Sequence, residues 1–135
     1  VQADAEAFAP LAAAYRLPKE TPAQQAAKAA ALEAALDGAC TVPLAILEAC
    51  GEGIALAAEY AEKGSVLAVS DAGCAALFCK AAMEAAGLNV SINTKLMADR
   101  AKAKAFHARA DALLAEYAPL ADKLYEKLAH QLREE

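Results

Sequence analysis

Apolar residues in the middle of this chain recur alternately four and three positions apart. From Leu36 the series continues at helical spacing to Ile54, through Cys40, Pro43, Leu47 and Cys50. This spacing places the side chains on one face of an α-helix and is typical of the seam between bundled helices. Alanine is abundant, Trp is absent and aromatic residues make up only 5% of the chain, a composition that favours helix over strand. The sequence therefore predicts an all-α fold, an antiparallel helical bundle.

The size and charge of the chain limit what it can be. Its 135 residues are enough for one hydrophobic core, so we expect a single helical domain over residues 1–135. The net charge of −5 argues against a nucleic-acid partner, which requires clustered Lys and Arg. No uncharged stretch is as long as a bilayer span, so we expect no membrane partner. No signal-peptide pattern opens the sequence, and we expect a cytoplasmic protein.

Proline residues and short polar side chains predict where the helices begin and end. A first helix, residues 4–15, should end before Pro18, and Thr21 followed by Pro22 predicts the start of a second. Because an internal proline removes a backbone hydrogen bond, we expect a kink or local break near Thr41 to Pro43.

The second half of the chain should contain three more helical segments. Ser70 or Asp71 is expected to cap a helix over residues 72–86 that ends at Gly87. A further turn or two should cover residues 89–97, and Asp99 should cap the last helix.

Polar residues cluster where these helices end or break. Asn89 and Asn93 are four positions apart, so in a helix both amides project from one face and could hold a polar heterocycle. They could instead satisfy backbone groups near Gly87, and the spacing alone favours this backbone role over ligand binding. Arg16 and Lys19 could be ordinary solvated charges. The four cysteines, Cys40, Cys50, Cys74 and Cys79, lack the CxxC pairing of a metal or redox site, and we expect them to pack in the core.

Asp71, which follows Ser70, has two possible roles. The commoner role of such a pair is to cap a helix. If Asp71 is instead buried among helices, desolvation would raise its pKa and suit it to proton transfer.

At these same positions the sequence resembles the cyclodeaminase domain of formiminotransferase-cyclodeaminase and the related methenyltetrahydrofolate cyclohydrolases. The resemblance rests on five short stretches, taken in order along the chain: Asp4-Ala-Glu-Ala-Phe8, Arg16-Leu-Pro-Lys19, Val42-Pro43, Ser70-Asp71 and Asn89-Val-Ser-Ile-Asn93. It covers residues 4–99. A Pro-Gly-Gly-Gly-Ser-like motif near the start of family members has no counterpart here.

The resemblance implies an all-helical dimer that acts on a tetrahydrofolate derivative without a metal. It implies conversion of 5-formiminotetrahydrofolate to 5,10-methenyltetrahydrofolate and ammonia, with hydrolysis of the methenyl bridge as an alternative. Asp71, and after it Asp4, would transfer protons. Ser70, Asn89 and Asn93 would bind the pterin or orient the adduct. Arg16 and Lys19 would pair with the carboxylates of the glutamate tail, which is polyglutamylated in some folates.

Two structural expectations follow from this resemblance. Asp71, Asn89 and Asn93 should converge on one polar groove near Pro43. The seam from Leu36 to Ile54 should lack partners within the chain, which would make the protein at least a homodimer. A different class of function, a non-catalytic helical interaction module, stays open.

Overall fold

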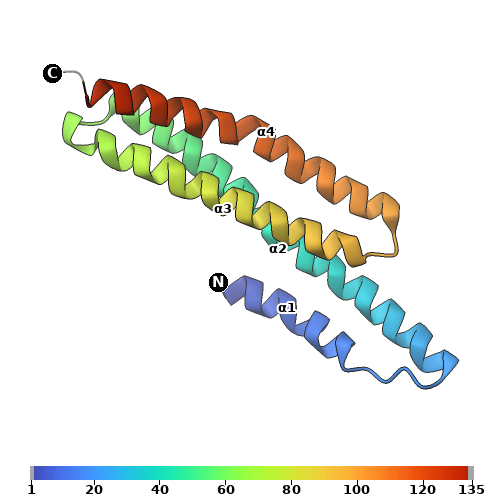
Figure 1. The fold of residues 1–135 in the computed structure, drawn as a ribbon. Helices are drawn as coiled ribbons and strands as arrows, with labels where there is room; N and C mark the ends of the chain where they lie inside the picture. Colours follow the sequence, from blue (N-terminus) through green and yellow to red (C-terminus); the bar gives the residue numbers. More distant parts are fainter. Residues whose placement is uncertain (1, 134–135) are drawn as a thin grey trace.

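The computed structural model describes residues 2–133, apart from the side chains of Asp4 and Val66. Within that range the secondary structure is helical and contains no strand, which confirms the all-α prediction. The elements are α1 (Gln2–Tyr15), α2 (Pro22–Lys63), the short 3-10 helix η1 (Val66–Ala68), α3 (Val69–Leu96) and α4 (Arg100–Gln131). The long helices α2, α3 and α4 form an antiparallel bundle, and α1 folds back along the first half of α2 (Figure 1).

The predicted starts of α2 and α4 are confirmed by their capping bonds. The Gln24 amide donates to Thr21 Oγ1 over 3.2 Å, and the Thr21 amide donates to Gln24 Oε1 over 3.1 Å. The Asp99 side chain accepts from the Lys102 amide at 2.9 Å. Each cap satisfies backbone donors that have no partner inside their helix.

The seam from Leu36 to Ile54 lies inside the protein. Leu36, Cys40, Pro43, Leu47 and Ile54 are all buried. Leu47 and Ile54 belong to the main core between α2, α3 and α4, and Leu36 and Cys40 belong to a second core that includes α1. The expectation that this seam lacks partners within the chain is therefore wrong, because α1, α3 and α4 cover it.

Two helices of the bundle, α2 and α3, are long and apolar enough to cross a membrane by length and composition. Core helices of soluble proteins pass the same test, so two such helices are weak evidence for a membrane protein. Alanine supplies much of their apolar character, and Glu48 and Glu52 interrupt the most apolar part of α2.

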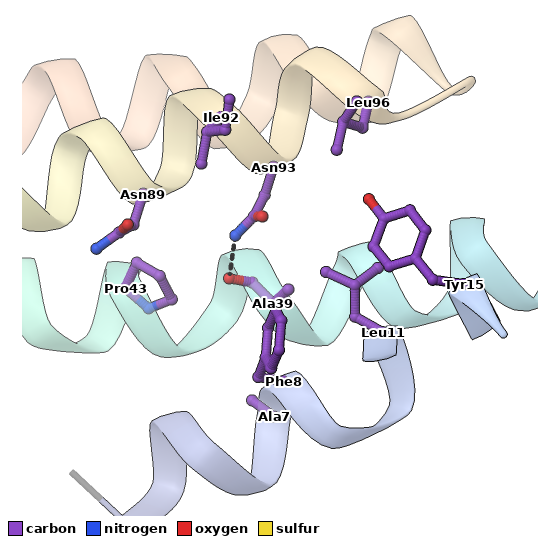
Figure 2. Close-up of a pocket in the computed structure, with 10 residues that line it drawn as sticks. All are labelled: Ala7, Phe8, Leu11, Tyr15, Ala39, Pro43, Asn89, Ile92, Asn93 and Leu96. Atoms are coloured by element: carbon purple, nitrogen blue, oxygen red, sulfur yellow. Dashed lines mark hydrogen bonds between the residues drawn. The ribbon is translucent and has the colours of Figure 1, made fainter. Parts of the chain in front are cut away.

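The helix break expected at Pro43 is absent, and a side chain of another helix donates to the carbonyl that Pro43 leaves without a backbone donor. Helix α2 runs uninterrupted from Pro22 to Lys63. Pro43 has no amide hydrogen for the carbonyl of Ala39, four residues earlier. The Asn93 side chain of α3 donates its Nδ2 to that carbonyl oxygen over 2.8 Å (Figure 2).

Replacing Asn93 should cost less stability when Pro43 has also been replaced than when Pro43 is present. Asn93→Leu leaves the Ala39 carbonyl without its donor, which we expect to lower the free energy of unfolding by about 1–3 kcal/mol. Pro43→Ala restores a backbone donor, so in that background the same Asn93 change should cost less. Urea unfolding of the two single variants and the double variant measures the difference, and strictly additive costs would contradict the pairing.

Helix α3 also continues through Gly87, where the sequence predicts a stop. Gly87 has a negative φ like the other described glycines. A Cβ on Gly87 would lie 3.3 Å from a methyl group of Leu114 on α4. The glycine therefore allows α3 and α4 to pack closely.

Gly51 and Gly38, both inside α2, should respond to alanine in opposite directions. A Cβ on Gly51 would lie 2.6 Å from the Tyr117 ring, whereas a Cβ on Gly38 has no neighbouring atom within 4 Å. We expect Gly51→Ala to destabilise the protein by about 1–3 kcal/mol through overpacking. Gly38→Ala should stabilise it by up to about 1 kcal/mol through helix propensity. Urea unfolding compares the two, and equal effects would contradict the close contact with Tyr117.

Candidate functional site

A cavity of about 350 Å³ lies between α1, α2 and α3 (Figure 2). Its walls are mainly apolar and include two aromatic rings, and its polar side chains come chiefly from α3. The lining residues are Ala7, Phe8, Leu11, Tyr15, Ala39, Pro43, Asn89, Ile92, Asn93 and Leu96. An apolar cleft with a few convergent polar groups is the usual form of a small-molecule site, and this volume is near the lower end of the usual range.

Asn89 and Asn93 enter this cavity together, as their spacing predicts. Both belong to α3 and face α2, Asn89 opposite Pro43 and Asn93 opposite Ala39 (Figure 2). Asn93 is half-buried and satisfies a backbone group, although on α2 rather than near Gly87. Asn89 is exposed at the cavity surface, where its amide can both donate and accept. Asn89 and Asn93 thus line one cavity, whose α2 wall includes Pro43.

Asp71 does not reach this cavity within one chain. It lies in the first turn of α3, 18 residues before Asn89, which corresponds to about 27 Å along the helix axis. It lines a separate hollow of about 340 Å³ with Leu56 and Tyr60 of α2. The predicted convergence of Asp71 with Asn89 and Asn93 is therefore wrong for a single chain, because the continuous helix α3 holds them apart.

Neither Ser70 nor Asp71 is the helix cap expected from the sequence. The helix begins at Val69, after η1, and its N-cap position is Ala68, with no side-chain capping bond. Both Ser70 and Asp71 are exposed, so within one chain the condition under which burial would raise the pKa of Asp71 is not met. A carboxylate in the first turn nevertheless favours the helix through the backbone dipole.

Arg16 and Lys19 are exposed in the connection between α1 and α2. Arg16 directly follows Tyr15, whose ring lines the cavity. Lys28 fixes this connection by donating from Nζ to the carbonyl oxygens of Tyr15 (2.6 Å) and Leu17 (2.9 Å). Asp4 belongs to α1, one turn before Phe8, and its side chain lies outside the described part of the structure.

The apolar walls are the part of the site that sequence reasoning missed. Phe8 and Tyr15 of α1 were not among the predicted site residues, yet both are about half exposed and line the cavity. Ile92 and Leu96 of α3 complete the opposite wall and are also about half exposed. The sequence did contain a signal for this wall, because Leu88, Ile92 and Leu96 follow one another at four-residue spacing.

The cysteines are mostly core residues, as expected. Cys40 is fully buried, and burial raises the pKa of its thiol to about 11. Cys50 and Cys79 are half-buried against the main core, and burial, followed by the neighbouring Cys79, raises the pKa of Cys50. Cys74 is the exception, because it is exposed on α3. Among the described residues, no group of three or more His, Cys, Asp or Glu side chains could hold a metal ion.

Comparison with known proteins places this architecture in a family. Residues 1–112 match the family model described as formiminotransferase-cyclodeaminase. The chain is 44% identical over 123 residues to a Methylorubrum extorquens protein named methenyltetrahydrofolate cyclohydrolase. The aligned region covers 91% of this chain and 59% of that relative. It is 36% identical over 116 residues to the formimidoyltransferase-cyclodeaminase of Mus musculus, covering 86% of this chain and 21% of the relative.

The chain thus spans less than two thirds of the length of either relative. The match nevertheless extends over the first part of α4 and over α1, α2 and α3, the three helices that line the cavity. The chain therefore belongs to the formiminotransferase-cyclodeaminase family.

Proposed function

We propose that this chain binds a tetrahydrofolate carrying a one-carbon unit and hydrolyses its 5,10-methenyl bridge. The observation that carries the proposal is the cavity, in which Asn89 and Asn93 project from one face of α3 between apolar and aromatic walls. The relative named methenyltetrahydrofolate cyclohydrolase, with 44% identity over most of this chain, supports the choice of reaction.

The chemistry of the cavity suits a pterin ring. The edge of a pterin presents donors and acceptors side by side, and an asparagine amide can pair with both. The flat rings of Phe8 and Tyr15 provide apolar surface for its faces. A volume of about 350 Å³ is too small for an entire folate, so the aminobenzoyl-glutamate part would extend into solvent. Arg16 and Lys19, exposed next to Tyr15, are the cations available to its carboxylates.

Hydrolysis of the bridge requires water to add to the methenyl carbon. A base takes one proton from the attacking water, giving a hydroxyl on the carbon between N5 and N10. The bond from that carbon to N5 then breaks, the hydroxyl proton is transferred to N5, and the carbon stays on N10 as a formyl group. A carboxylate near the cavity would serve as the base.

Among the described residues that line the cavity, none carries a carboxylate. The candidates are therefore Asp71 and, after it, Asp4, whose position in α1 is one turn from Phe8.

A cyclodeaminase reaction is the second candidate, favoured by the mouse relative named formimidoyltransferase-cyclodeaminase. There N10 attacks the formimino carbon of 5-formiminotetrahydrofolate, and ammonia leaves to give the methenyl product. The same acid–base group would transfer the protons.

An absorbance assay of the methenyl group distinguishes these functions. Each folate is incubated with purified protein and, in parallel, without protein to measure spontaneous hydrolysis. Faster loss of methenyl absorbance than in the protein-free control supports the cyclohydrolase, and its appearance from the formimino substrate supports the cyclodeaminase. No change with either substrate would contradict both reactions and favour a non-catalytic interaction module.

A further inference from the structure

One face of α3 carries an apolar heptad pattern that no other part of the described chain covers. Its positions repeat alternately four and three residues apart, as in a coiled coil. We call six of these residues the α3 seam: Cys74, Phe78, Ala81, Ala85, Leu88 and Ile92. All six are exposed, with Phe78 at 76% and Leu88 at 72% of their full accessibility. A row of large apolar side chains this exposed marks an interaction surface.

The α3 seam is self-complementary when two copies are placed antiparallel. Its spacing is symmetric about position 83, so each residue meets a counterpart in the same layer. Ala81 faces Ala85 of the partner subunit at the centre, Phe78 faces the partner's Leu88, and Cys74 faces the partner's Ile92. Small residues at the centre let the helices approach closely, and large residues on both sides fill the space. An isologous two-fold interface requires this self-matching arrangement.

Charge adds a layer at each end of the α3 seam. The heptad continues to Asp71 on one side and Lys95 on the other, and both are exposed. In the antiparallel register Asp71 lies level with the partner's Lys95, so each end of the interface carries one pair of opposite charges. This complementarity favours a second copy of this chain over an unrelated apolar partner.

The same register brings a carboxylate to the candidate site. Ile92 belongs both to the α3 seam and to the cavity wall, and Leu96, one turn further, also lines the cavity. The partner's Asp71 therefore lies beside the mouth of the cavity. Measured along the helix axis, the partner's Asp71 is about 3 Å from the level of Asn93. The axes of the two paired helices are about 8–10 Å apart. The two-fold axis also places the partner's Asp71 on the same side of the helix pair as Asn93. This is the side of α3 that faces α2.

We propose that two copies of this chain pair antiparallel through the α3 seam, and that the active site is completed by Asp71 of the partner subunit. The catalytic part of this inference rests on the proposed function, whereas the pairing does not. The partner would supply a carboxylate, which the described residues of the cavity lining lack, and Asp71 would be buried at the interface.

Cysteine cross-linking tests the register without any activity measurement. In the proposed dimer, Ile92→Cys places a thiol opposite the native Cys74 of the partner. Diamide takes two electrons and two protons from the thiol pair as it is reduced to a hydrazine and the S–S bond forms. We expect the variant to convert to a disulfide-linked dimer on a non-reducing gel. The wild-type protein should not form this linked dimer, because the Cys74 residues of its two subunits lie about 27 Å apart along the helix axis.

Two control variants make the result specific. Ile92→Cys combined with Cys74→Ser should give no linked dimer. Leu88→Cys, displaced by one turn or about 6 Å from the Cys74 layer, should link at least about tenfold more slowly. Equal linking of Leu88→Cys and Ile92→Cys, linking of wild type through Cys74, or a monomer mass for wild type in light scattering would each overturn the proposal. The last result would indicate that the α3 seam binds something other than a second copy.

Discussion

Replacing Asp71 with asparagine is expected to lower turnover of the folate substrate by about two to four orders of magnitude, the usual contribution of a general acid–base group. Asparagine keeps the size and hydrogen-bonding capacity of the side chain but cannot carry the proton. Asp71 makes no capping bond in α3, so within one chain the change should remove only a favourable charge in the first turn, worth about 0.3–1 kcal/mol. Between subunits it should also remove the charge pair with the partner's Lys95, so light scattering must show that the variant keeps the wild-type mass.

The measurement is kcat for wild type and variant, alongside urea unfolding to verify that both are folded. Asp111→Asn is the matched control, since Asp111 is an exposed carboxylate on α4 and should leave turnover unchanged. Full activity in a folded Asp71→Asn variant would remove Asp71 from the mechanism.

Replacing Phe78 with glutamate should separate the two subunits and abolish most of the activity. The change puts a charge without a partner into an apolar layer of the α3 seam, which typically costs about 3–5 kcal/mol when the charge is buried. Because 1.4 kcal/mol corresponds to a tenfold change, the dissociation constant should rise by about a hundredfold or more. Phe78 is 76% exposed in the single chain, so the fold itself should tolerate the change.

Light scattering measures the mass, which should fall to that of the 13.9 kDa chain. Tyr125→Glu is the control, because Tyr125 is an exposed aromatic residue on α4 that should remain outside the interface. A Phe78→Glu variant that keeps both the wild-type mass and the wild-type turnover would contradict the interface.

Much of the fold could be predicted from the sequence because its signals are local. The helical spacing of the apolar residues predicts the bundle, and Thr21 and Asp99 mark helix starts through bonds to residues three positions away. The pairing of Asn89 and Asn93 likewise follows from a four-residue spacing within one helix.

The errors arise where contacts between helices override local preferences. Pro43 would break an isolated helix, but Asn93, which is distant in the sequence, supplies the missing donor. Gly87 would favour a stop, but close packing against Leu114 gives it a different role. The order of motifs along the chain also gave no indication that Asp71 and Asn89 lie at distant points of one continuous helix.

Mixing two inactive variants tests most directly whether the site is shared between subunits. Asp71→Asn retains an intact cavity, and Asn89→Ala retains an intact Asp71, so a mixed dimer contains one complete site and one site with both changes. Wild-type, single-variant and mixed proteins are refolded together at equal concentrations, and the loss of methenyl absorbance is followed for each. Random pairing makes half of the dimers mixed, so the mixture should recover about one quarter of wild-type turnover. A mixture no more active than the average of its two parents would contradict a site completed by the partner subunit.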